Sequence, residues 1–377
     1  MARRESLRAL LPSLQGMKYP IAAAPMAFIS GAELAVAVSQ AGGLGFIAAG
    51  YDMLKLEAEL RRARGLLALE EEPSTPLPVG VGLIAWTSAR SPSERQQLLS
   101  NILSHRPSAL WLFAPEESEE EEEKGGGFLS WVNTVHQLSS SSSSPPPAVF
   151  AQVGSVKEAL EASESGVDVV VAQGHDAGGH GRKASAGLTA LLPEVRDAFS
   201  AHHQQKNKEE GAKGRGPLLW AAGGIMDGRG IAAAMALGAD GVVLGTRFLV
   251  AEEARLPPAH REAVLKAEDG GRNTTRTRLF DELRSTTGWP AVYDGRALRN
   301  EMVRQWEEEG REPQSNKAER MKEEYRTAVE EGDYERVVVW AGCGVGLARE
   351  VKPAAEIVEE LVHEYRKVVR ELPEKLF

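Results

Sequence analysis

Short apolar runs recur along the first 250 residues of the chain, and stretches with helical spacing of apolar residues separate them. Runs rich in valine, isoleucine and leucine are typical of strands that are buried on both faces. Alternation of such strands with helices predicts a parallel sheet with right-handed crossovers. The predicted strands are residues 21–24, 45–47, 78–84, 109–113, 148–152, 167–172, 218–222 and 241–244.

Eight strand–helix units favour a closed barrel over an open doubly wound sheet. The chain is therefore expected to be an α/β protein with a (β/α)8, or TIM, barrel. Residues 31–40 are expected to form one of its helices, because Gly42 and Gly43 follow as a stop signal. Ser155 is the expected N-cap of another helix, with Glu158 completing a capping box.

The pattern changes after residue 249, where arginine, threonine and charged residues become frequent. Residues 249–346 are expected to form a helical cap subdomain over the mouth of the barrel. A final amphipathic helix at about 354–372 is expected to complete the ring of helices. The barrel would then comprise residues 1–248 and 347–377.

Three polar inserts interrupt the barrel pattern: an acidic run with glycines at 116–127, a serine and proline tract at 139–147, and a polar stretch at 202–216. Each would gain little by packing, so they are predicted to be mobile surface loops. They are expected at helix–strand connections, on the barrel face away from the chemistry.

The predicted strand at 167–172 leads into a glycine-rich loop that carries His175 and His180. Loops at the C-terminal ends of barrel strands carry the reactive groups, and histidine titrates near neutral pH. A catalytic loop and a glycine turn with surface histidines are equally consistent with this segment taken alone.

Two later strand ends tip the balance toward a ligand site. Gly223 and Gly224 follow one predicted strand, and Gly245 and Thr246 follow the next. Backbone N–H groups at such ends suit a phosphate, which barrel enzymes commonly hold after strands seven and eight. Two ordinary βα turns remain the structural alternative, because glycine is the default turn residue.

Composition narrows the possible partners and compartments. The net charge of −10 argues against a nucleic-acid surface, and no apolar stretch is suited to span a membrane. Cys343 is the single cysteine, so an intramolecular disulfide is excluded and a reducing, cytoplasmic compartment is expected. The sequence leaves open whether copies associate into a homo-oligomer.

Five short blocks in order along the chain resemble the nitronate monooxygenase family, formerly called 2-nitropropane dioxygenases. They are Tyr-Pro-Ile and Ala-Pro-Met at 19–26, Ser-Gln-Ala-Gly-Gly-Leu-Gly at 39–45, Ala-Gln-Gly-His-Asp-Ala-Gly-Gly-His at 172–180, Ala-Ala-Gly-Gly-Ile at 221–225, and Leu-Gly-Ala-Asp-Gly-Val at 237–242 followed by Gly245 and Thr246. A weaker match continues through Trp289 and residues 294–300.

The resemblance implies a TIM barrel with non-covalent FMN, which oxidises alkyl nitronates with O2 to carbonyl compounds and nitrite. It implies that His180 faces the flavin as the catalytic base. The implied cofactor-binding residues are Gly223, Gly224, Gly245 and Thr246 at the phosphate, Pro25 and Met26 along the isoalloxazine, Gln173, Gly178 and Gly179 on its other flank, and also Ala24, Gly82, Gln152 and Gly174. No metal is implied.

Two positions depart from the family pattern. Many members have Gly-Val-Asn at the third strand end, where the amide contacts the flavin, and this chain has glycine at position 82. Many have Gly-Gln near the C-terminal glycine motif, where this chain has Gly342 and Cys343. FMN remains expected, while substrate and subclass stay open.

Two rival functions remain. One is an FMN-dependent NAD(P)H reductase of quinones or enoyl thioesters, because the glycine motifs indicate the flavin and not its reductant. The other is a barrel that has lost catalysis and only binds a ligand, against which the intact block around His180 argues.

For the other candidate residues, structural roles are expected ahead of a role in the site. A peripheral or surface position is expected for His175, a turn cap for Asp176, and a small buried side chain for Cys343. Core packing is the better expectation for Trp86, Trp289 and Trp340, although they could line an apolar pocket. Arg296 and Arg299 either bind a substrate carboxylate or pair with glutamates.

Overall fold

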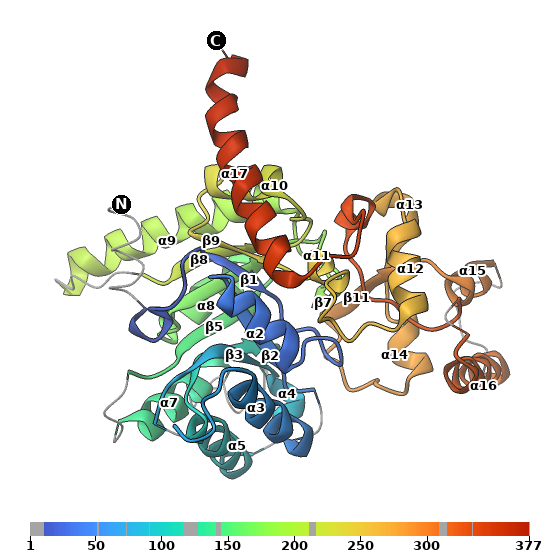
Figure 1. The fold of residues 1–377 in the computed structure, drawn as a ribbon, viewed down its shortest axis with the longest axis horizontal. Helices are drawn as coiled ribbons and strands as arrows, with labels where there is room; N and C mark the ends of the chain where they lie inside the picture. The colour runs from blue at the N-terminus through green and yellow to red at the C-terminus, as the bar shows by residue number, and fades with distance from the viewer. Residues whose placement is uncertain are drawn as a thin grey trace.

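The structure is a computed structural model that describes residues 11–50, 53–72, 74–89, 91–115, 127–140, 145–210, 216–308, 315–333 and 335–376. The eight predicted strands form a closed parallel barrel, in which β1 pairs with both β2 and β9 (Figure 1). In barrel order they are β1 (Ile21–Ala23), β2 (Leu44–Ala48), β3 (Leu77–Ile84), β4 (Pro107–Phe113), β5 (Ala148–Val153), β6 (Val169–Gln173), β8 (Leu218–Ala222) and β9 (Gly241–Leu244). The TIM-barrel prediction is confirmed, with strand ends displaced by at most two residues.

Helices surround the barrel, as the alternating pattern predicts. They are α2 (Ala32–Gln40), α3 (Met53–Leu66), α4 (Ala85–Ser88), α5 (Pro92–Ser104), α7 (Phe128–Ser139), α8 (Val156–Glu164), α9 (Leu188–Glu210), α10 (Gly228–Ala236) and α17 (Ala354–Leu376), with a 3-10 turn, η1, at Pro12–Leu14. The last helix, α17, packs against α2 and α10, so it completes the ring as expected (Figure 1). Ser155 caps α8 by accepting a hydrogen bond from Glu158 N at 3.3 Å.

Aromatic side chains fill the inside of the barrel. The rings of Phe46, Trp111, Phe150 and Trp220 pack edge to face, with neighbouring centroids 5.3–5.4 Å apart. A Cβ added to Gly80 would overlap the Phe46 ring, so glycine on β3 makes room for that large side chain. Full burial of such a side chain stabilises the fold by roughly 1.5–3 kcal/mol.

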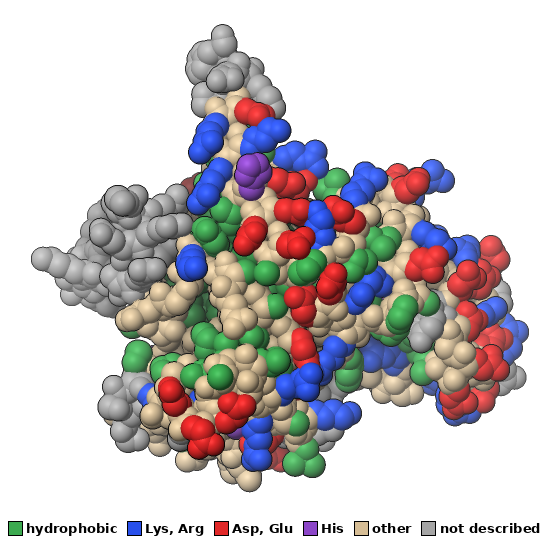
Figure 2. All heavy atoms as spheres, viewed as in Figure 1, with side chains coloured by type: hydrophobic (Ala, Val, Ile, Leu, Met, Phe, Trp, Pro, Cys, Tyr) green, Lys and Arg blue, Asp and Glu red, His purple; other side chains and the backbone are tan. Residues whose placement is uncertain are grey.

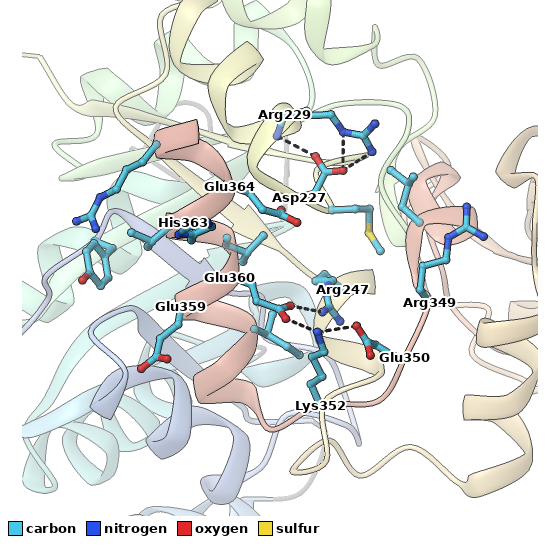
Figure 3. A pocket seen from close by; sticks show the side chains of 17 residues that line it. Asp227, Arg229, Arg247, Arg349, Glu350, Lys352, Glu359, Glu360, His363 and Glu364 are labelled. Carbon is cyan, nitrogen blue, oxygen red and sulfur yellow. Dashed lines mark hydrogen bonds and ion pairs between the residues drawn. The ribbon is translucent and has the colours of Figure 1, made fainter. Parts of the chain in front are cut away.

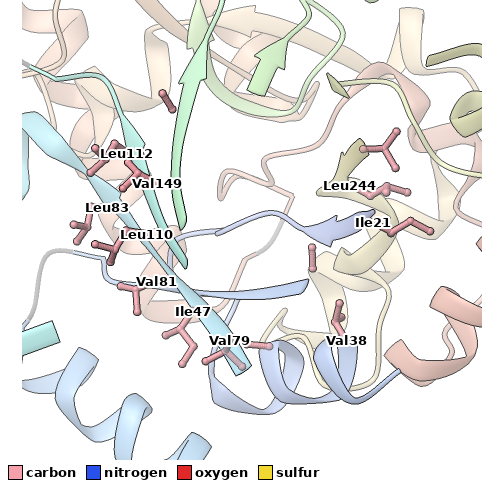
Figure 4. Packing of buried hydrophobic residues seen from close by; sticks show 14 of the residues in the cluster. Ile21, Val38, Ile47, Val79, Val81, Leu83, Leu110, Leu112, Val149 and Leu244 are labelled. Atoms are coloured by element: carbon pink, nitrogen blue, oxygen red, sulfur yellow. The ribbon is translucent and has the colours of Figure 1, made fainter. Parts of the chain in front are cut away.

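A second apolar layer lies between the barrel strands and the surrounding helices (Figure 4). On β3 and β4 this layer is made by every second residue, because successive side chains of a strand point to opposite faces. Its members include Val79, Val81 and Leu83 on β3 and Leu110 and Leu112 on β4. The barrel is therefore packed on both faces, which fixes the strand ends that carry the site.

Most of the chain between β9 and α17 lies to one side of the barrel, and we keep the name cap for it (Figure 1). Its elements are α11 (Thr246–Leu249), α12 (Pro258–Lys266), α13 (Gly270–Asn273), β10 (Thr274–Thr277), α14 (Leu279–Leu283), β11 (Tyr293–Leu298), α15 (Glu301–Glu308), α16 (Ser315–Glu331) and the 3-10 helix η2 (Cys343–Leu347). Leu279, Phe280, Met302, Val303 and Tyr325 contribute to a separate apolar cluster within it.

The expectation of a purely helical cap is wrong in one respect. The cap contains a three-stranded antiparallel sheet in the order β10–β11–β7. Strand β7 (Gly179–Arg182) comes from the connection between β6 and α9, far before residue 249. The glycine-rich loop therefore does not end in solvent, because its last residues pair with β11 of the cap.

The three inserts have different outcomes. Residues 116–126 and 141–144 lie outside the described part of the chain, so their predicted loops are not described here. Residues 202–210 continue helix α9, so the prediction of a loop beginning at 202 is wrong for that portion. The helix formers Gln, Lys and Glu dominate this stretch, and they extend a helix that is already formed.

Charged side chains of both signs are interspersed on the face of the molecule shown in Figure 2, most densely over α15 and α16. That face carries no continuous basic patch of the kind that binds nucleic acid. Within the described ranges, no helix combines the length and the apolar character needed to cross a membrane.

Candidate functional site

A cavity of about 620 Å³ lies where the C-terminal ends of the barrel strands meet the cap. This is the face of a TIM barrel on which active sites are built. Twelve of the fourteen predicted site residues line it: Ala24, Pro25, Met26, Gln152, Gln173, Gly178, Gly179, His180, Gly223, Gly224, Gly245 and Thr246. The fold thus brings together residues from five separate strand ends.

Backbone groups form one end of this cavity. Gly223 and Gly224 have φ angles of 113° and 69°, a region that favours glycine. The nearest atoms to a Cβ added at Gly245 lie 3.8 Å away, so there is open space in front of this residue. Within the described residues, the N–H groups of Gly224, Gly245 and Thr246 have no hydrogen-bond acceptor. These N–H groups are suited to bind the oxygens of an anion such as phosphate.

The segment after β1 forms one side of the cavity. Met26 N donates to Ser30 Oγ at 3.1 Å, and Ser30 Oγ donates to the Ala24 carbonyl at 3.0 Å. A Cβ added to Gly82 would overlap Pro25. Gly82 therefore makes room for Pro25 and lies behind it, not on the cavity wall where the sequence placed it.

Gly174 also lies outside the cavity lining. Its N–H donates to the Ala222 carbonyl at 2.9 Å, and a Cβ added there would press on Leu188. This glycine allows the start of α9 to pack closely on the loop. Its position supports a role in shaping the loop and gives no direct contact with the cavity.

Two glutamines on the cavity wall each use one end of the side-chain amide in a hydrogen bond within the protein. Gln152 Oε1 accepts from Trp111 Nε1 at 3.1 Å, which leaves its NH2 group for a ligand. Gln173 Nε2 donates to the His180 carbonyl at 3.1 Å, so the end of β6 is tied to β7. The barrel thereby fixes the backbone of the candidate catalytic residue.

The His180 ring contacts two tryptophans and, at one edge, a carboxylate. It stacks on Trp289 with a centroid distance of 4.0 Å and an interplanar angle of 7°. Trp340 lies against it at 4.9 Å, tilted by 51°. At the edge, Nε2 is 2.9 Å from Asp281 Oδ1. The ring has one position fixed by its neighbours, and it lines the cavity.

Sequence reasoning missed Asp281 and undervalued the two tryptophans. Asp281 lies on α14, 101 residues after His180, within a Leu-Phe-Asp-Glu-Leu stretch that resembles an ordinary amphipathic turn. Trp289 and Trp340 line the cavity, whereas Trp86 packs on Trp289 behind it. The antiparallel pairing of β7 with β11, and the bridge between Ala297 and Trp340, help to bring these residues together.

The remaining candidates lie beside the cavity and serve the structure. Arg276 and Arg296 both donate to the His175 carbonyl, and burial followed by these two guanidinium groups lowers the pKa of the His175 ring. Arg299 pairs with Glu307, so neither arginine singled out in the sequence reaches the cavity lining. Cys343 is half-buried, and its N–H donates to the Asp176 carbonyl at 2.9 Å.

A larger pocket of about 1030 Å³ lies beside α17 on the outside of the barrel (Figure 3). Its wall carries acidic and basic side chains that pair with one another, as Asp227 does with Arg229 and Glu360 with Arg247 and Lys352. None of the predicted site residues lines it. The smaller cavity is therefore the candidate active site, because it holds the histidine and the free N–H groups.

Comparison with known proteins gives the class of protein that this fold and site define. The sequence pattern of the nitronate monooxygenase family matches residues 8–79 and 133–364. A nitronate monooxygenase of Neurospora crassa is 38% identical over 98% of this chain and 96% of its own length. The nitronate monooxygenase npaC of Metarhizium robertsii is also 38% identical, over 98% of this chain and 97% of its own.

Solved structures agree with this assignment of the fold. FabK from Thermotoga maritima superimposes with a TM-score of 0.70 at 27% identity, covering 98% of both chains. The nitroalkane oxidase from Streptomyces ansochromogenes gives a TM-score of 0.69 at 25% identity, covering 97% of this chain and 99% of that chain. The chain belongs to the nitronate monooxygenase family of oxidoreductases.

Proposed function

We propose that this protein binds FMN in the 620 Å³ cavity and oxidises alkyl nitronates with O2 to carbonyl compounds and nitrite. The observation that carries the proposal is a fixed imidazole, His180, in the same cavity as a set of free backbone N–H groups. The names of the fungal relatives and the nitroalkane oxidase fold neighbour support the same reaction class.

The residues present fit a flavin mononucleotide. Gly224, Gly245 and Thr246 would hold the phosphate through N–H groups that have no other acceptor within the described ranges. Pro25 and Met26 would lie along the flat ring system, and the free NH2 of Gln152 would donate to one of its polar atoms. Bound FMN would supply the electron-transfer chemistry by which a nitronate and O2 yield a carbonyl compound and nitrite.

His180 is the residue proposed to move a proton. In a neutral nitroalkane the hydrogen on the carbon beside the nitro group is acidic, and its removal gives the nitronate. A base held within hydrogen-bond reach, with a pKa near the working pH, is suited to that transfer. The stacking of Trp289 and the contact with Trp340 keep the ring oriented.

The structural likeness to FabK supports a second candidate, an NAD(P)H-dependent flavin reductase. The barrel and its glycine-lined phosphate end are compatible with both reactions. The lower identity to FabK, 27% against 38% for each fungal relative, makes this the weaker candidate. Flavin reduction by NAD(P)H distinguishes the two.

A His180→Asn variant tests the proposed base. Asparagine keeps the size and polarity of the side chain but cannot take the proton, so turnover of neutral nitroethane should fall by about 10²–10⁴-fold. The flavin absorbance per protein should stay unchanged, because the phosphate end is untouched. Nitrite release measured with nitroethane and with pre-formed ethyl nitronate checks this. Undiminished nitroethane turnover in the variant would contradict the assignment.

A further inference from the structure

The buried carboxylate of Asp281 is the one charged group within the described ranges that is hydrogen-bonded to the His180 ring. Asp281 is 1% exposed and lies in the cap on α14, next to apolar Phe280. A buried carboxylate is costly unless it is hydrogen-bonded or paired with a charge. Its partners therefore indicate what it does.

Those partners are few and neutral. Oδ1 accepts from Thr286 Oγ1 at 3.2 Å and lies 2.9 Å from His180 Nε2. Oδ2 is buried and has no hydrogen-bond partner in the described part of the chain. No arginine or lysine there forms an ion pair with this carboxylate, although Arg284 and His260 line the same cavity. The one basic side chain in contact with this carboxylate in the described part of the chain is that of His180.

In its ionised form the Asp281 carboxylate only accepts hydrogen bonds. Facing that form, Nε2 carries the hydrogen and the neutral ring keeps its lone pair on Nδ1. No described residue hydrogen-bonds to Nδ1, and the ring lines the cavity. The carboxylate thus selects the tautomer in which the nitrogen left for the substrate is the basic one.

We propose that Asp281 is a positioning residue for proton abstraction, which fixes the His180 tautomer and stabilises the imidazolium formed when Nδ1 takes the substrate proton. This rests on the proposed function. In that step the C–H bond beside the nitro group breaks, its electron pair stays on the substrate as the nitronate, and the proton passes to Nδ1. No oxidant is needed until the nitronate has formed.

The proposed role of Asp281 predicts that its substitution affects the turnover of two substrates differently. A neutral nitroalkane needs proton removal, whereas a pre-formed nitronate does not. Asp281→Asn should lower kcat for nitroethane by about 10²-fold and leave kcat for ethyl nitronate nearly unchanged. The acid limb of the pH profile of kcat for nitroethane should also move, because the variant lacks the negative charge that stabilises the imidazolium. A purely structural role would lower both activities together.

Nitrogen-15 NMR of the histidine side chains gives a readout that does not depend on turnover. The His180 signals are assigned by their absence in His180→Asn, and the wild-type protein should show hydrogen on Nε2 and a bare Nδ1. In Asp281→Asn that tautomer should be lost or mixed, because an amide can also donate to Nε2. Hydrogen on Nδ1 in the wild-type protein would overturn the proposal.

Two further variants distinguish the proposed role of Asp281 from a general loss of folding. Asp240→Asn changes a mostly buried carboxylate just before β9, which pairs with Arg196 and not with His180 and lies outside the cap, so it should not split the substrates. Thr286→Val keeps the Asp281 carboxylate but removes its second donor, so the split should be smaller and in the same direction. An equal split in Asp240→Asn contradicts the proposal. If the wild-type protein turns over no nitronate, the proposed function fails, while the tautomer still decides the role of Asp281.

Discussion

Two parts of the cavity lining, a proposed phosphate end and a histidine end, are built in different ways. At the proposed phosphate end, backbone N–H groups come from turns after β8 and β9, which are neighbours in both sequence and space. At the histidine end, side chains of His180, Asp281, Trp289 and Trp340 converge from the barrel connection and from three parts of the cap. The first end depends on local chain geometry, and the second depends on how the cap docks on the barrel.

Under the proposed function, the phosphate end binds the cofactor and the histidine end carries out proton transfer. A change at the phosphate end should alter cofactor content while leaving the histidine in place. A change in the cap should alter proton transfer or stability while leaving the glycine turns intact. Variants in each region therefore test whether the two ends act separately.

Gly245→Asp should have the largest effect, the loss of bound FMN. Its backbone φ of −104° is open to any residue, and the nearest atoms to an added Cβ are 3.8 Å away, so the fold should tolerate the change. The new carboxylate would face the phosphate, and like charges in contact cost several kcal/mol, so affinity should fall at least ~10²-fold. Flavin absorbance and FMN titration measure this.

Gly16→Asp is the matched control for that variant. A Cβ at Gly16 meets nothing within 4 Å, and this residue is not part of the cavity lining. Its flavin content should equal that of the wild-type protein. Equal flavin content in Gly245→Asp as well would mean that the phosphate does not lie at this strand end.

Arg276→Met should break the docking of the cap. Arg276 pairs with Asp294 at 2.7 Å and donates to the Gly181 carbonyl of β7 at 3.0 Å, and both side chains are nearly buried. Removing one partner of a buried pair leaves an uncompensated charge, so the free energy of unfolding should fall by about 3–5 kcal/mol. Denaturant unfolding of the FMN-free and FMN-bound protein measures this loss.

An exposed pair in the same cap gives the comparison for Arg276. Arg304 and Glu301 form an ion pair on α15, with side chains 52% and 43% exposed. Exposed pairs contribute about 0–1 kcal/mol, so Arg304→Met should change stability little. Similar losses in the two variants would show that Arg276 does not anchor the cap.

The smallest effect is expected at His260, on α12 beside the cavity. Burial lowers the pKa of His260 from its usual value to about 4. Between about pH 6.5 and pH 4 the unfolded chain binds a proton there that the folded chain does not, so acid should destabilise the fold across this window. At pH 4 the contribution is at most about 3 kcal/mol.

His260→Gln removes that titration. The variant should lose less stability than the wild-type protein when the pH falls from 7 to 4.5, as measured by denaturant unfolding at both values. His363→Gln, at an exposed position on α17, is the matched control for the change of side chain. An unchanged pH dependence in His260→Gln would show that His260 does not titrate in the unfolding equilibrium.

The same difference explains what could be predicted from the sequence. Apolar runs gave all eight barrel strands, because strand burial is a local pattern. The glycine pairs indicated the phosphate end, because φ angles such as that of Gly223 are a local requirement. Asp281 could not be found this way, since nothing near it in sequence distinguishes a buried carboxylate from an exposed one. Gly82 was expected at the cofactor only from the family resemblance, and nothing near it in sequence shows that this glycine makes room for Pro25.

The most direct measurement is the visible spectrum of the purified protein under anaerobic conditions, before and after addition of ethyl nitronate or, separately, NADH. The proposed function predicts a flavin spectrum that is reduced by the nitronate and is unaffected by NADH. Reduction by NADH with no response to the nitronate would instead assign the protein to the reductases, and absence of a flavin spectrum would contradict the proposed cofactor.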